Sequence, residues 1–182
     1  YTGYNLFINN TDSKLWFYLR HNYTSPNQII IKSDIALVNN VWYNLVVSYD
    51  GSSTATGCKM YIDNVNVSTT ESDTLTYSIL NNEPLRIGGR SPLTSNFANG
   101  SISNVSVWNT ALSLSQVREI YNQGLPGNLN SHSAYSILVS WWQLGENSSF
   151  DGNNWILADE KGTNNGTSTG MPVGALVNGV GT

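Results

Sequence analysis

Acidic residues that lie close together in the sequence are the first candidates for chemistry. Glu71 and Asp73 are two positions apart, and Asp159 and Glu160 are adjacent. Hydrolysis of a glycosidic bond needs two carboxyl groups about 5 to 9 Å apart, one on each side of the bond. Glu71 and Asp73 lie in a segment rich in Thr and Ser that we expect to be a loop, and adjacent acids on a strand face opposite sides. We therefore predict no catalytic residues and no enzymatic activity.

Other side chains that carry out catalysis or bind metals are few. The chain has two histidines, His21 and His132, and one cysteine, Cys58. A single cysteine excludes an internal disulfide and a zinc cluster of several thiolates. We expect His21 to lie on a surface turn and Cys58 to be a buried, unreactive thiol.

Three aspartates could supply oxygen ligands to a calcium ion. Calcium takes about 6 to 8 oxygen ligands, several of them from carboxylates. Asp50, Asp63 and Asp73 offer such oxygens. Each also has a simpler explanation, because Asp50-Gly51 and Asp63-Asn64 are typical turn dipeptides. The sequence thus requires no cofactor and leaves calcium as a candidate.

The chain is rich in aromatic residues, some of which could form one wall of a ligand site. The chain contains 6 Trp and 10 Tyr. Sugar sites place aromatic rings against the apolar face of a sugar, and a few amides and hydroxyls orient the ligand. The candidate glycan-binding residues are Tyr23 and Tyr77, both in predicted loops, and Trp155. Four other tryptophans are expected to fill the core: Trp42, Trp108, Trp141 and Trp142.

The charge of the chain excludes two classes of partner. Of 182 residues only 8 are Lys or Arg, the net charge is −4, and charged residues make up 11% of the chain. A nucleic-acid-binding protein needs a basic stripe, and a membrane-spanning helix needs about 20 consecutive apolar residues. Neither feature is present in the sequence. We predict that the protein binds no nucleic acid and does not insert into membranes.

Short apolar or alternating runs between turn clusters predict an all-β fold. In the run 15–20, Leu15, Phe17 and Leu19 alternate with Trp16, Tyr18 and Arg20, so that the two sets face opposite sides of a strand. Similar runs predict further strands, and their spacing indicates a two-sheet sandwich or barrel. These runs cover residues 4–8, 28–31, 42–49, 59–62, 65–67, 85–87, 102–108, 137–144 and 150–157.

One short surface helix is predicted near residues 113–123. Ser113 and Gln116 have the spacing of a capping box, and Leu112 and Val117 that of a hydrophobic staple. Gly124 suits the position after the last helical turn. From Lys161 onward the chain is rich in Gly, Thr, Asn and Ser, which favours a loop or linker.

Five segments that follow one another in order resemble a known family. They are Trp42–Gly51, Met60–Asn64, Leu85–Gly89, Phe97–Asn109 and Ala111–Ser113. In this order they resemble the laminin-G-like, pentraxin-like branch of the concanavalin A-like lectin/glucanase superfamily. The resemblance covers roughly half of the chain. It implies an antiparallel two-sheet sandwich of the jelly-roll type, in which many family members bind calcium at the rim.

The resemblance also implies how the chain is divided. The family usually opens with two or three strands before the equivalent of Tyr4, and these are absent here. Residues 1–126 are expected to form the laminin-G-like sandwich, and residues 127–182 a C-terminal extension. The segment Trp141–Glu146 resembles the opening of another such domain. The extension therefore either packs on the sandwich or starts a second tandem unit.

The resemblance implies surface recognition rather than catalysis. We predict a non-catalytic, carbohydrate-binding or adhesive module that is part of a larger extracellular or virion-surface protein. Its partners would then be glycans. The alternative is a structural assembly or decoration module of a phage or virus particle, whose partners would be neighbouring subunits of an oligomeric parent protein. This assignment rests on the fold family and not on a recognised site.

Overall fold

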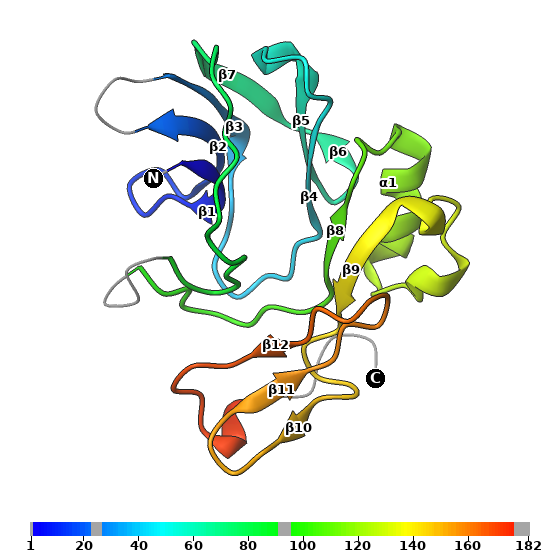
Figure 1. Ribbon diagram of the computed structural model, residues 1–182. Coiled ribbons are helices and arrows are strands. Elements are labelled where there is room, and N and C mark those ends of the chain that lie inside the picture. Colours follow the sequence, from blue (N-terminus) through cyan, green and yellow to red (C-terminus); the bar gives the residue numbers. More distant parts are fainter. Residues whose placement is uncertain (1, 23–26, 91–95, 177–182) are drawn as a thin grey trace. The chain divides into compact units, whose positions relative to one another are not determined.

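Antiparallel strands are the main regular structure of the protein, which divides into two compact units (Figure 1). The computed structural model describes residues 2–22, 27–90 and 96–176. Unit 1 comprises Tyr1–Glu83 and Thr110–Gly124, and unit 2 comprises Pro84–Asn109 and Leu125–Thr182. The predicted boundary near residue 126 stays a prediction.

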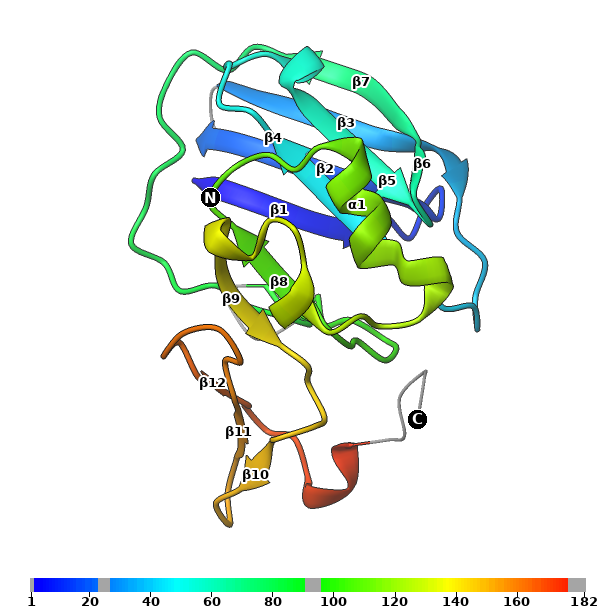
Figure 2. The same ribbon diagram turned by 90° about the vertical axis from the view of Figure 1, so that its right-hand side faces the viewer.

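Unit 1 contains a four-stranded antiparallel sheet, sheet 1. Its strands are β1 (Gly3–Ile8), β2 (Lys14–Asn22), β3 (Asn27–Ala36) and β7 (Ser68–Asp73), in the order β1-β2-β3-β7. Figure 2 shows these strands running side by side. The β1–β2 hairpin pairs Gly3 with Arg20 and Ile8 with Leu15. Residues 9–13 form the turn that joins the two strands.

A second sheet of unit 1, sheet 2, has three strands. These are β4 (Leu45–Tyr49), β5 (Cys58–Ile62) and β6 (Val65–Asn66), in the order β4-β5-β6. A short 3-10 helix (Ala55–Gly57) precedes β5. Asp63 and Asn64 connect β5 to β6 with φ angles of 48° and 67°, which Asp and Asn tolerate better than most residues. The predicted tight turn at this position is thus observed.

The core of unit 1 lies between the two sheets. Leu15, Phe17 and Leu19 of β2 are buried, whereas Trp16, Tyr18 and Arg20 are only half-buried. Ile29 and Ile31 of β3 join them, and sheet 2 contributes residues that include Cys58, Met60 and Ile62. Because each sheet buries one face against the other, the two layers form a sandwich. The predicted all-β, antiparallel two-sheet, jelly-roll-type fold is confirmed.

The single α-helix of the described residues, α1 (Leu114–Tyr121), belongs to unit 1. Both hydrogen bonds of the predicted capping box are present, between Ser113 and Gln116. The helix is shorter than expected, because Asn122 adopts a left-handed conformation with φ of 41° and ends it. A 3-10 turn (Asn122–Gly124) follows.

Unit 2 contains two small sheets. β8 (Val105–Trp108) pairs with β9 (Leu138–Trp142), and Trp141 and Trp142 are buried as predicted. The other sheet has the order β10-β11-β12, from β10 (Ser149–Phe150), β11 (Trp155–Leu157) and β12 (Gly166–Thr167). Three 3-10 helices complete the unit: Leu129–Ser131, Tyr135–Ile137 and Val173–Ala175.

Several segments differ from the sequence-based expectation. The predicted Thr/Ser-rich loop forms β7 because its backbone pairs with β3. Residues 85–87 do not form a strand, and the predicted linker contains β12. Trp42 is 46% exposed rather than buried, since β4 begins only at Leu45 and strand alternation does not extend to Trp42.

Candidate functional site

Tyr77 is an exposed aromatic side chain at the edge of unit 1. Its side chain is 66% exposed, and it lies in the segment that follows β7. An exposed tyrosine on a free loop would lose conformational entropy on binding a ligand. The contacts of this segment with β2 and β3 therefore decide whether Tyr77 can act as a binding platform.

The side chain of Asn27 fixes the backbone on both sides of Tyr77. Its Oδ1 accepts hydrogen bonds from the backbone N–H groups of Thr76 and Tyr77, both at 3.1 Å. Its Nδ2 donates to the carbonyl of Thr74 at 3.0 Å and to Oγ1 of Thr76 at 2.6 Å. The Asn27 side chain, at the start of β3, thus holds the segment after β7 with both its oxygen and its nitrogen. The position of Tyr77 is therefore fixed before a ligand binds.

His21 lies next to Tyr77, where β2 ends. The two ring centroids are 5.1 Å apart, with an interplanar angle of 35°. Nδ1 of His21 is 2.6 Å from the carbonyl oxygen of Ser78. Because a carbonyl oxygen only accepts, Nδ1 carries the hydrogen of this hydrogen bond. We call His21 and Tyr77 the rim pair.

Trp155 has a structural role in unit 2. It pairs directly with Phe150 across β10 and β11, and their ring centroids are 5.4 Å apart. Its indole Nε1 donates to the carbonyl of Pro172 at 3.0 Å, and its backbone N donates to Oγ of Ser168 at 2.8 Å. These contacts attach the segment after β12 to β11. Tyr77 and Trp155 belong to different units, and Tyr23 lies outside the described residues.

Asp50 and Asp73 lie around the same short helix, Ala55–Gly57. Oδ1 of Asp73 accepts from the backbone N of Ala55 at 2.9 Å, and Oδ1 of Asp50 accepts from the backbone N of Ser52 at 2.9 Å. A Cβ at position 57 would collide with the Asp50 carboxylate, so Gly57 allows the close approach. Hydrogen bonds from the side chain and backbone of Ser52 lower the pKa of Asp50.

Asp63 lies at the other end of sheet 2, in the β5–β6 turn. Its Oδ1 accepts from the backbone N of Asn44 at 2.8 Å, and its backbone N donates to the carbonyl of Asn44 at 2.9 Å. The three candidate calcium ligands therefore do not share one site. Within the described ranges, no three His, Cys, Asp or Glu residues are grouped so that they could hold a metal ion.

Cys58 is buried in the core of unit 1. Burial raises the pKa of its thiol to about 12, and the nearby carboxylates of Asp50 and Asp73 act in the same direction. A thiol needs a lowered pKa and access to solvent to act as a nucleophile. The expectation of a buried thiol is confirmed.

The two acid pairs are placed differently from what the sequence suggested. Glu71 lies on β7 and forms an ion pair with Lys32 at 2.8 Å, whereas Asp73 binds the backbone of Ala55. Asp159 is buried in unit 2, and Oε1 of Glu160 accepts from Nδ2 of Asn147 at 2.9 Å. In each pair, the two carboxylates therefore bind different groups of the protein and do not act together.

Aromatic and charged side chains cover the outer face of sheet 1, which sequence reasoning did not identify as a site. Trp16 and Tyr18 of β2 make an edge-to-face contact at 6.0 Å, and Phe7 of β1 contacts Tyr18 in the same manner at 5.1 Å. The signal was present in the sequence, because the outward positions of β2 carry aromatic residues instead of small polar ones. We call these three residues the aromatic band.

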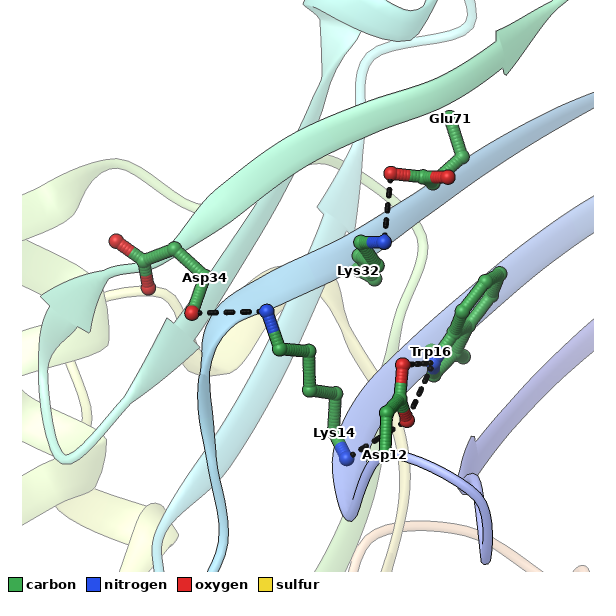
Figure 3. A network of polar contacts seen from close by, with 6 residues as sticks. All are labelled: Asp12, Lys14, Trp16, Lys32, Asp34 and Glu71. Atoms are coloured by element: carbon green, nitrogen blue, oxygen red, sulfur yellow. Dashed lines mark hydrogen bonds and ion pairs between the residues drawn. The ribbon is translucent and has the colours of Figure 1, made fainter.

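Charged residues lie beside the rings of the aromatic band, and Figure 3 shows those near Trp16. Both carboxylate oxygens of Asp12 accept from Nε1 of Trp16, at 3.2 and 3.1 Å. Nζ of Lys32 lies 5.1 Å from the ring centroid of Trp16 and pairs with Glu71. The guanidinium of Arg20 lies 4.7 Å from the ring centroid of Tyr18. Cation–π contacts of this kind fix ring orientation.

Comparison with known proteins gives a match over most of the chain. A laminin G family model, described as concanavalin A-like lectin/glucanases superfamily, matches residues 1–118. One similar solved structure is residues 221–444 of an S-layer domain-containing protein from Clostridium thermocellum, at 19% identity and a TM-score of 0.38. That match covers 66% of this chain and 64% of the other. No curated protein matches the chain.

In the part of the chain that the structure describes, no helix has the length and apolar character of a membrane span.

Proposed function

The chain belongs to the concanavalin A-like lectin/glucanases superfamily, and on that premise we propose that it is a non-catalytic carbohydrate-binding module. We infer that it acts in an extracellular or virion-surface protein, where a neutral polar surface with few charges meets external glycans. The observation that carries the proposal is the rim pair. Tyr77 is exposed, and its backbone is nevertheless fixed by Asn27.

The rim pair suits the surface chemistry of a sugar. A pyranose has an apolar face of C–H groups, which packs against an aromatic ring, and hydroxyls at its edge, which need polar partners. The Tyr77 ring supplies the apolar surface. The second ring nitrogen of His21, Nε2, supplies a polar partner for a sugar hydroxyl, since Nδ1 is engaged by Ser78. A preorganised platform loses less entropy on binding than a mobile one.

The test is a glycan array probed with the wild-type protein and three variants. Tyr77→Ala removes the platform, and we expect binding to weaken at least about tenfold, equivalent to about 1.4 kcal/mol. Tyr77→Phe keeps the ring and is expected to retain most of the affinity. Leu80→Ala is the matched control, because Leu80 is 87% exposed in the same segment. Equal binding by the wild-type protein and by Tyr77→Ala would show that the rim pair does not bind the glycan.

Calcium is tested on the same array, once with calcium and once with a chelator. The carboxylates of Asp50, Asp63 and Asp73 already accept backbone hydrogen bonds. We therefore expect glycan binding that is the same in both conditions. Binding lost in chelator would show that glycan binding depends on a calcium ion. Binding to no glycan in either condition would favour the alternative, an assembly module that contacts neighbouring subunits of a particle.

A further inference from the structure

We propose that the outer face of sheet 1 is a second carbohydrate-binding surface, which takes an extended neutral polysaccharide along β2. This inference rests on the proposed carbohydrate-binding function but uses residues separate from the rim pair. The surface consists of the aromatic band and the charged residues around it. It faces away from the core, because Leu15, Phe17 and Leu19 occupy the alternate positions of β2.

The aromatic band supplies ring surface along one direction. Trp16 and Tyr18 are successive outward residues of β2, and Phe7 is paired with Trp16 on the neighbouring strand. Lys14 and Arg20 continue the outward row at its two ends. Six residues of extended strand span about 20 Å, which is longer than one sugar ring. A row of this length fits a chain of several sugar units better than a monosaccharide.

The rings of the band are held in place before any ligand binds. Asp12 binds Nε1 of Trp16, and Lys32 lies over the same ring and is itself anchored by Glu71. Arg20 lies over Tyr18, and its Nε donates to Oε1 of Gln28 at 2.7 Å. Because these contacts fix the rotamers, binding costs little side-chain entropy. The same contacts leave the edges of the rings surrounded by polar groups that suit sugar hydroxyls.

The charges on this surface balance, which favours a neutral ligand. Three basic residues, Lys14, Arg20 and Lys32, are matched in number by three acidic residues. The acidic residues are Asp12, Asp34 and Glu71, and Figure 3 shows five of these six residues in one network with Trp16. A polyanion would meet the carboxylates of Asp12 and Glu71 beside the cations, and these would oppose its attraction to the basic residues.

The ionisation of Asp12 maintains this balance at neutral pH. Partial desolvation would raise the pKa of its carboxyl group, but hydrogen bonds from the backbone of Lys14 and from Trp16 outweigh that effect and lower the pKa. Nearby Lys32 and Lys14 act in the same direction. Asp12 therefore stays charged and keeps Trp16 fixed over the pH range in which the protein would meet its ligand.

Affinity electrophoresis in gels that contain a polysaccharide tests the inference. The neutral probes are laminarin, xylan and mannan, and the acidic probe is alginate. We expect at least one neutral probe to retard the wild-type protein. Trp16→Ala and Tyr18→Ala should each weaken the interaction at least about tenfold. Tyr4→Ala is the matched control, because Tyr4 is an exposed aromatic residue on the same sheet but on its opposite side, paired with Leu19.

A second measurement uses only the wild-type protein, in case the variants do not fold. Hydrogen exchange is followed with and without the retarding polysaccharide, and we expect slower exchange in the β2 peptide that covers residues 14–20. Retardation by alginate alone, no retardation by any neutral probe, or exchange in β2 that is unchanged by the polysaccharide would overturn the inference. Tyr77→Ala separates the two proposals, because it should weaken binding on the array at least about tenfold and leave the retardation intact.

Discussion

Replacing Asp159 with alanine removes the acceptor that ties the loop after β11 to strand β9 in unit 2. The side chain of Asp159 is 8% exposed. Its Oδ1 accepts from the backbone N of Trp141 at 2.9 Å and from that of Lys161 at 3.1 Å. Its Oδ2 accepts from the backbone N of Asn164 at 3.2 Å. One carboxylate thus satisfies three backbone donors, and the Trp141 donor lies in a buried strand.

The expected cost follows from these three hydrogen bonds. A hydrogen bond to a charged acceptor contributes about 1.5 to 3 kcal/mol, and a buried donor left without a partner costs about 1 to 3 kcal/mol. Water can replace the carboxylate at the partly exposed N–H groups of Lys161 and Asn164, but not at Trp141. We expect Asp159→Ala to lower the stability of unit 2 by about 3 to 4 kcal/mol. Asp159→Asn, which keeps one acceptor, should cost about half as much.

The assay is amide hydrogen exchange at Trp141, combined with chemical denaturation. A probe local to β9 is needed, because the chain has two compact units and one unfolding curve can combine two transitions. Asp151→Ala is the control, since the Asp151 carboxylate also accepts backbone hydrogen bonds, from Asn153 and Asn154, but at an exposed turn. It should cost about 0.5 kcal/mol. An Asp159→Ala protein within 0.5 kcal/mol of wild type would refute the reasoning, since about 3 kcal/mol is expected.

The same carboxylate predicts an acid-sensitive unit 2. Desolvation would raise the pKa of Asp159, but the hydrogen bonds, that from Trp141 first, outweigh it and the pKa is lowered. A folded-state pKa below the unfolded value gives stability that is present above the unfolded pKa and is lost as pH falls through the folded pKa. Stability should therefore fall as the pH drops below about 3.8, the ordinary Asp value. Asp159→Asn should show a smaller acid dependence in denaturation at pH 5 and pH 3.

Three further perturbations test particular contacts of unit 1. Asn27→Ala removes the hydrogen bonds that hold the Tyr77 segment. The amide hydrogens of Thr76 and Tyr77 should then exchange with solvent at least about tenfold faster, whereas the global free energy of unfolding should fall by only about 1 kcal/mol. Ser113→Ala removes the helix cap and should lower the free energy of unfolding by about 1 kcal/mol in thermal or chemical denaturation. Cys58 should not react with a thiol reagent in the native protein at pH 8, because the thiol is buried and its pKa is raised to about 12. It should react fully after unfolding. Rapid labelling of the native protein would contradict the description of Cys58 as a buried, unreactive thiol.

Only one of the two residues of the rim pair could be predicted from the sequence. Tyr77 could be singled out because it lies outside the periodic runs, and its exposure agrees with that reading. Its partner His21 is 56 positions away, and no local pattern joins the two. Trp155 looked equivalent to Tyr77 in the sequence, but its indole N–H is bonded to Pro172 and its ring lies against Phe150. Loop placement alone does not distinguish a displayed ring from one that anchors a segment.

The sequence by itself determined the features that depend on neighbours a few residues away. The alternation of β2 separates inward Leu15 from outward Trp16, and the spacing of Ser113 and Gln116 creates the helix cap. These follow from the repeat of the backbone and from hydrogen bonds within one turn.

Tertiary structure alone decided the features that depend on distant pairing. It turned the Thr/Ser-rich segment into β7, because β3 offered a free edge whose Lys32 could pair with Glu71. It also brought Asp159 to Trp141. The reason is that backbone donors and acceptors are alike in every residue, so only the folded arrangement of strands determines which distant groups satisfy them.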